Sequence, residues 1–151
     1  MKELLIGVGV VMVGLLFALG VHATAPSIPF GELARRADCV VVGEFGGADS
    51  EDKRLELVFE LRAIVAGADC SSKRIEVREL SSEDTSGIRP GSYLLFLKKR
   101  PTGYSYAQSA FSLLPIRNGT VDTLFFPEME ERIPLEEVLR RIHRQRRLNA
   151  K

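Results

Sequence analysis

The clearest pattern in the chain is an alternation of apolar and polar residues between positions 55 and 65. Leu57, Phe59 and Leu61 fall on one face of an extended chain, and Glu60 and Arg62 fall on the other. Such alternation is typical of a β-strand with one covered face. The pattern therefore predicts a strand of about eleven residues, long enough to bend across a small barrel.

Four other segments have the composition of strands. Residues 39–42 and 93–97 are apolar on both faces, as central strands are. Residues 75–80 alternate again, and residues 104–126 predict one or two further strands. Within the last segment, Asn118-Gly119 predicts a two-residue hairpin turn of type I′.

Two segments have helical periodicity instead. Their apolar positions are Phe30, Leu33, Ala34 and Ala37 in the first, and Leu135, Val138, Leu139 and Ile142 in the second, where Pro134 suits a first helical position. The expected fold is therefore mainly β. We predict a small antiparallel OB-like barrel of five to six strands with a short N-terminal helix and a C-terminal helix, and a two-layer β-sandwich is the alternative.

The N-terminal segment has the pattern of an export signal. Lys2 and an apolar run from Leu4 to Val21 are followed by Ala23 and Ala25, the small residues of a cleavage site. The pattern predicts a signal peptide that is cleaved after Ala25. The run of 18 residues is also close to the length that spans a bilayer, so a retained membrane anchor is the alternative.

These boundaries divide the chain into three parts. Residues 1–25 are the signal peptide or anchor, residues 26–146 are a single barrel domain with its C-terminal helix, and residues 147–151 are a basic tail. Both interpretations of the N-terminus place the domain outside the cytoplasm. It is expected to be periplasmic or secreted, or else anchored to the membrane and facing outward.

The charge of the domain argues against nucleic acid as a partner and indicates one basic surface. Without Lys2 and Glu3, the chain has 20 basic and 19 acidic residues, whereas a nucleic-acid-binding domain would be strongly basic. The basic excess lies in the C-terminal helix, where it predicts contact with anionic lipid or an acidic partner. Alternatively, these arginines only complement the negative end of the helix dipole. They are Arg140, Arg141, Arg144, Arg146 and Arg147.

Cys39 and Cys70 are the two cysteines of the chain. In an oxidising compartment, two cysteines usually pair. A hairpin of the first two strands would bring Cys39 near the far end of the second strand, a few residues before Cys70, so we expect a disulfide between them. The alternatives are unpaired structural side chains and a reactive or metal-binding thiol, for which His143 is the only histidine after position 25.

The remaining polar residues favour a binding protein over an enzyme. One histidine and two separated cysteines do not match the spacing of a zinc site, and the sequence has no nucleophile elbow or phosphate-binding glycine loop. We therefore predict no catalytic residue, no metal ligand and no cofactor. Asp49, Glu51 and Asp52 form an acidic loop, which would bind calcium weakly or would simply be solvated.

Two further features have both a structural and a functional interpretation. Asn118-Gly119-Thr120 has the form of a glycosylation sequon, although the hairpin turn explains the same residues. Tyrosines on strands usually pack with the hydroxyl at the rim, but they would form a binding face if the barrel used its side. The tyrosines concerned are Tyr93, Tyr104 and Tyr106.

Six segments resemble, in their order, a type of small exported bacterial protein. They are ELARRADCVVVGEF, LELVFELRAIVAG, IEVREL, RPGSYLLFL, FSLLPIRNGTV and IPLEEVLRRI, within residues 31–143. They look like secreted proteins whose OB fold is similar to the tissue inhibitors of metalloproteinases and the netrin module. The resemblance implies the fold and carries no catalytic signature. The inhibitors use an N-terminal Cys-x-Cys to bind a protease's zinc; here Pro26 is the expected first residue, so protease inhibition does not carry over.

The sequence therefore predicts a non-enzymatic, exported binding or interaction module of the bacterial envelope. Its partner would be an envelope protein or ligand that no residue identifies. The alternative is a membrane-anchored accessory protein, held by an uncleaved N-terminal helix or by the basic C-terminal helix.

Overall fold

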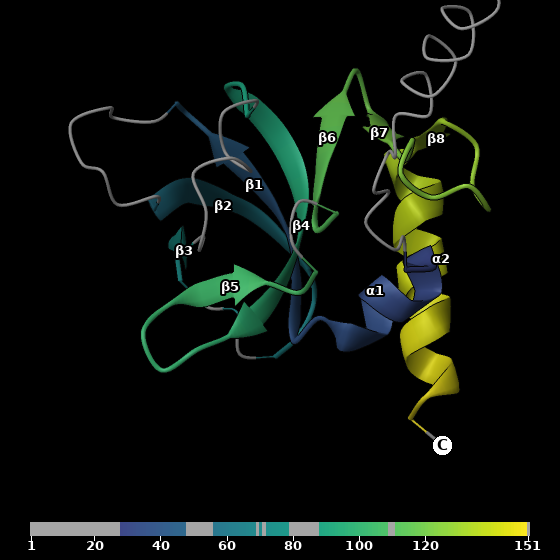
Figure 1. Ribbon diagram of the computed structural model, residues 1–151, viewed down its shortest axis with the longest axis horizontal. Coiled ribbons are helices and arrows are strands. Elements are labelled where there is room, and N and C mark those ends of the chain that lie inside the picture. The colour runs from purple at the N-terminus through teal and green to yellow at the C-terminus, as the bar shows by residue number, and fades with distance from the viewer. Residues whose placement is uncertain are drawn as a thin grey trace, which may run out of the picture.

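The computed structural model describes residues 28–47, 56–68, 70, 72–78, 88–108 and 111–150. The predicted signal peptide or anchor, residues 1–25, lies outside the described residues, and so does the acidic loop with Asp49, Glu51 and Asp52. Within the described ranges the chain forms two helices and eight strands (Figure 1). They are α1 (Phe30–Arg36), β1 (Cys39–Phe45), β2 (Glu56–Ala66), β3 (Arg74–Arg78), β4 (Gly91–Lys99), β5 (Tyr104–Tyr106), β6 (Leu113–Arg117), β7 (Thr120–Asp122), β8 (Arg132–Pro134) and α2 (Leu135–Leu148).

Five of these strands close into a barrel. The order is β1-β2-β3-β5-β4, and β4 pairs back with β1. An odd number of strands cannot close with every pair antiparallel, and the exception is β3 with β5, which are parallel at Val77 and Tyr104. The predicted OB-like barrel is thus confirmed, and the sandwich is not formed.

A second layer lies outside the barrel. Strands β6, β7 and β8 extend the sheet from β4, and α1 and α2 lie together on the same side of the barrel (Figure 1). Val138 and Ile142 of α2 are buried there, and Leu135 and Leu139 pack against the same cluster, as the periodicity predicts.

Strands β1 and β4 are covered on both faces, which confirms the prediction from their composition. In β1, Val41 and Phe45 point into the barrel, while Val40 packs in the cluster under the helices. In β4, Leu95 lies in the barrel and Phe96 lies under the helices. These two strands therefore separate two apolar cores.

The predicted strand of about eleven residues is β2, with 11 residues. Its apolar face does not continue unchanged along its length, because Leu57 and Phe59 are buried whereas Ala63 is exposed. The pairing of β1 with β2 shifts register between Val40 and Val41, and again between Val42 and Gly43. Such irregularities bend a strand and redirect its side chains.

The segment 104–126 differs from its prediction. It forms three short strands, β5 to β7, and β7 ends at Asp122, so residues 124–126 lie in a loop. The Asn118-Gly119 turn is confirmed, because both residues have positive φ, 51° and 74°, as type I′ requires.

At the start of α2, Pro134 is the last residue of β8 and precedes the helix instead of opening it. At its other end, α2 continues to Leu148, so the first two residues of the predicted basic tail are helical.

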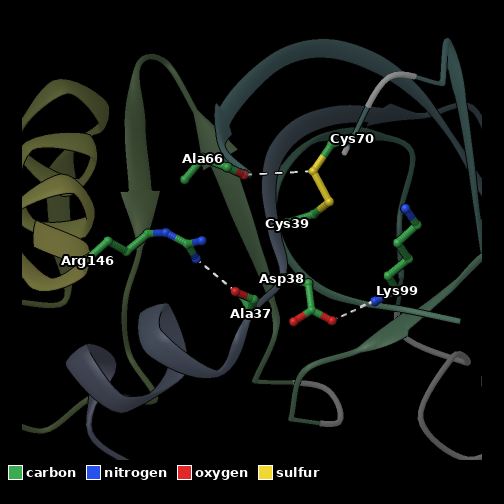
Figure 2. Close-up of a disulfide and its surroundings, with 7 residues drawn as sticks. All are labelled: Ala37, Asp38, Cys39, Ala66, Cys70, Lys99 and Arg146. Atoms are coloured by element: carbon green, nitrogen blue, oxygen red, sulfur yellow. Dashed lines mark hydrogen bonds between the residues drawn. A yellow bond between two sulfur atoms is a disulfide. The ribbon is translucent and has the colours of Figure 1, made fainter. Parts of the chain in front are cut away.

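The predicted disulfide is confirmed. Cys39 and Cys70 are bonded, with their Cα atoms 6.0 Å apart (Figure 2). Both side chains are 1% exposed, so the bond lies within the barrel core and leaves neither thiol for metal binding or catalysis. It joins the start of β1 to the turn after β2, where Val40 pairs with Ala66.

Gly67 makes the approach of these two segments possible. It has φ +106°, and a Cβ placed on it would lie 2.4 Å from the carbonyl oxygen of Asp38 and 2.9 Å from the sulfur of Cys70. A glycine is therefore required at this position both by the backbone conformation and by the space.

We expect Gly67→Ala to lower the free energy of unfolding by about 2–4 kcal/mol, through backbone strain and overpacking. Urea denaturation measures the change, and thiol labelling of the purified protein reports whether the disulfide still forms. Gly46→Ala is the matched control, because no described residue other than its chain neighbours has an atom within 4 Å of its added Cβ. Equal losses in the two variants would contradict the steric argument.

Candidate functional site

Two of the five predicted arginines are engaged by one carboxylate of α2. Glu137 accepts a hydrogen bond from Arg141 at 3.0 Å and forms an ion pair with Arg140 at 2.8 Å. The hydrogen bond from Arg141 is the largest influence on Glu137 and, with the neighbouring arginine charges, it holds the pKa of that carboxyl below its ordinary value of 4.5. This group is ionised at neutral pH and reduces the charge that Arg140 and Arg141 offer to a partner.

Arg146 faces the protein and ties α2 to α1. Its guanidinium donates a hydrogen bond to the carbonyl oxygen of Ala37 at 2.8 Å (Figure 2). It donates a second one to the carbonyl oxygen of Ala34 at 3.2 Å. These carbonyls belong to the C-terminal end of α1, where orphan acceptors and the negative dipole favour a cation. Of the five arginines predicted to contact an anionic partner, Arg144 and Arg147 therefore remain the main candidates. Both are exposed.

Asp38 lies between α1 and β1, and its carboxylate connects this point of the chain to the end of β4. Its carboxylate accepts a hydrogen bond from the Lys99 backbone N–H at 2.9 Å (Figure 2). It accepts another from the Lys98 ammonium at 3.0 Å. Partial burial raises the pKa of Asp38, but the hydrogen bonds from Lys98 and Lys99 lower it. The charges of Lys98 and Arg146 lower it further, so the pKa lies below 3.8.

An open pocket of about 320 Å³ lies where α1, α2 and the β7–β8 loop meet. Its charged groups are partly satisfied already, because Glu128 accepts the backbone N–H of Phe30 at 2.6 Å and Glu137 pairs with α2 arginines. Arg144 and Gln145 are its remaining donors. The arrangement fits a small polar group and holds no nucleophile–base pair. Its lining residues are Phe30, Gly31, Glu128, Met129, Glu137, Arg141, Arg144 and Gln145.

The tyrosines considered for a binding face are packing residues of the barrel. Tyr93 is 7% exposed, and its hydroxyl donates a hydrogen bond to the carbonyl of Arg89 at 2.5 Å. Tyr104 and Tyr106 are half-buried and pack against the barrel core. His143 is exposed on α2.

The β7–β8 loop, residues 123–131, is held in place by buried groups. Thr123 is fully buried, its hydroxyl donates a hydrogen bond to the carbonyl of Glu130, and its N–H donates to the carbonyl of Glu131 at 2.9 Å. Phe126 is 1% exposed and packs edge-on against Phe30, with ring centroids 5.4 Å apart. The loop is therefore an ordered part of the second layer.

The same loop presents apolar side chains to solvent. Leu124 is 63% exposed and Phe125 is 49% exposed, and the ring of Phe125 is supported by Phe111 at 5.3 Å. Sequence reasoning missed this surface because it assigned residues 124–126 to a strand. Pro127 follows these apolar residues directly, and this proline was the available signal for a loop.

Within the ranges that the structure describes, no helix is long and apolar enough to cross a membrane. Among the same residues, no group of three or more histidine, cysteine, aspartate or glutamate side chains is placed to hold a metal ion. Comparisons with family models, with curated proteins and with solved structures find no match to this chain.

We expect Arg146→Ala to lower the free energy of unfolding by about 1.5–3 kcal/mol, because it removes charge-assisted hydrogen bonds to two carbonyls of α1. Arg147→Ala removes the same charge from the neighbouring exposed position and should change stability by less than about 0.5 kcal/mol. Chemical denaturation of both variants measures the difference. Similar effects at the two positions would show that the contact with α1 contributes nothing specific.

Asp38 should make stability depend on pH in the acidic range. Because its pKa is lower in the folded state, its contribution is complete above the ordinary value of 3.8 and is lost as the pH falls through the folded value. We expect Asp38→Asn to cost less than about 1 kcal/mol near pH 7, since the carboxylate is partly exposed. The gap between wild type and variant should shrink as the pH falls below 3.8.

Denaturation midpoints of wild type and Asp38→Asn across this pH range provide the measurement. Glu131→Gln, at an exposed carboxylate, serves as the control. A gap between wild type and Asp38→Asn that stays constant down to the lowest pH would contradict the assignment.

Proposed function

We propose that this chain is an exported, non-enzymatic interaction module of the bacterial envelope, and that it binds its partner through the β7–β8 loop. The observation that carries the proposal is the exposure of Leu124 and Phe125 on a loop held by Thr123 and Phe126. An ordered loop that exposes large apolar side chains has the character of a binding hot spot, where aromatic anchors dominate the affinity.

Two further features support this assignment. A buried disulfide is compatible with the oxidising compartments outside the cytoplasm. The pocket between α1 and α2 has its carboxylates occupied by arginines and by a backbone N–H, which favours binding over acid–base chemistry.

A membrane-anchored accessory protein is the second candidate, and one contact favours it. Glu128 of the loop bonds the N–H of Phe30, near the start of the described chain. If the apolar run from Leu4 to Val21 were retained as an anchor, the short segment that follows it would hold the loop near the bilayer. N-terminal sequencing of the exported protein separates the two candidates, because a chain that begins at Pro26 has lost the anchor.

The interaction surface is tested by site-specific photo-crosslinking in cells. A photoreactive phenylalanine analogue at position 125 should give a discrete adduct, whereas the same analogue at position 64 should not. Ile64 is the matched control, because it is 50% exposed but lies on the barrel strand β2. Adducts of equal yield at both positions, or none at either, would contradict the proposed surface.

A further inference from the structure

Charge is segregated along α2 and the loop that leads into it. Residues 122–137 contain six acidic residues and one basic residue, Arg132, whereas residues 138–150 contain five arginines and no acidic residue. Figure 1 shows β8 at one end of α2 and the C-terminus of the chain at the other. We call residues 122–137, which include the β7–β8 loop, β8 and the start of α2, the acidic end, and residues 138–150 the basic end. The two ends meet at the pocket that Glu128 and Glu137 share with Arg141 and Arg144.

Each end also exposes apolar side chains. The acidic end carries Leu124 and Phe125, and the basic end carries Leu148, which is 68% exposed. Leu148 lies one helical turn from Arg144 and next to Arg147, and both arginines are exposed. Both ends thus combine exposed apolar area with charge, and the two charges are opposite.

We propose that two copies of this chain associate through a two-fold axis, with the acidic end of one protomer on the basic end of its partner. In a dimer with a two-fold axis, the contact between an acidic end and a basic end occurs twice, because each protomer carries both ends. The axis also places the two α2 helices antiparallel, an arrangement in which their dipoles attract. The proposal rests on the proposed function, since it names the partner of the same loop.

The structure favours a second copy of the chain over a lipid surface as the partner of the β7–β8 loop. The exposed apolar residues of the loop are accompanied by Glu128, Glu130 and Glu131, and these carboxylates would be repelled by anionic lipid. The basic end of a second copy supplies both the complementary charge and an apolar contact through Leu148. Electrostatic complementarity of this kind fixes the orientation of partners and makes association depend on salt.

Analytical ultracentrifugation of the exported protein over a range of concentrations tests the inference. We expect a monomer–dimer equilibrium that weakens by about tenfold between about 50 and about 500 mM NaCl. Leu148→Ser and the double change Leu124→Ser/Phe125→Ser should each weaken it by about tenfold or more. Ile64→Ser, at an exposed apolar residue of β2, should leave the equilibrium unchanged.

A charge swap tests the orientation of the two copies. Glu130→Arg and Arg147→Glu should each weaken the dimer, and the protein with both changes should recover part of the affinity. Arg74→Glu, at an exposed arginine of β3, is the control and should have no effect. Mass analysis of the photo-crosslinked product from position 125 should identify the peptide of the partner subunit that contains its Leu148.

Several outcomes would overturn the inference. A monomer at every concentration, a dimer insensitive to these variants, or a mass that grows without limit in an open head-to-tail assembly would each do so. A monomer whose position 125 crosslinks to a different protein would overturn the dimer and leave the proposed function standing. If the protein is a monomer that binds anionic vesicles, and the Arg147→Glu variant no longer binds them, the basic end is assigned to lipid and the dimer is overturned.

Discussion

The pairing of β1 with β4 is the interaction on which the rest of the fold depends. It runs along the whole of β1, from Cys39 opposite Leu97 to Phe45 opposite Gly91. This pairing closes the barrel and also forms the wall between the two cores, because both strands bury side chains on both faces. The helices, the second layer and the β7–β8 loop are positioned by that wall.

The arginines of α2 show how one charged segment serves two purposes. Arg146 turns inward and binds the carbonyls of α1, and Arg141 pairs with Glu137 on its own helix. Arg144 and Arg147 remain exposed. The identity of the residue does not decide between these roles. Position on the helix decides it, because only some positions of an amphipathic helix face α1.

The alternation and periodicity of apolar residues were sufficient to predict the main elements. β2, the Asn118-Gly119 turn and the apolar stripe of α2 each follow from local spacing. The disulfide followed from one additional step, the expected hairpin of β1 and β2. These features are local or nearly local, so the sequence carries enough information to place them.

The features that the sequence did not predict depend on contacts between distant segments. Arg146 meets Ala34 across 112 positions, and Glu128 meets Phe30 across 98. The exposure of Leu124 and Phe125 follows from Phe126 being buried against α1, and an apolar triplet alone does not say which member is buried. The candidate site is built from such contacts, which is why composition and spacing did not locate it.

The position of the disulfide has a consequence for the order in which the fold can form. Cys70 follows Cys39 by 31 residues, whereas the partners of β1 in β4 follow later, at residues 91–97. A chain that emerges N-terminus first can therefore link its first strand covalently before the closing strand arrives. The short linked loop reduces the conformational search that remains for β1 and β4. The covalent link can thus form before the closure of the barrel that it later stabilises.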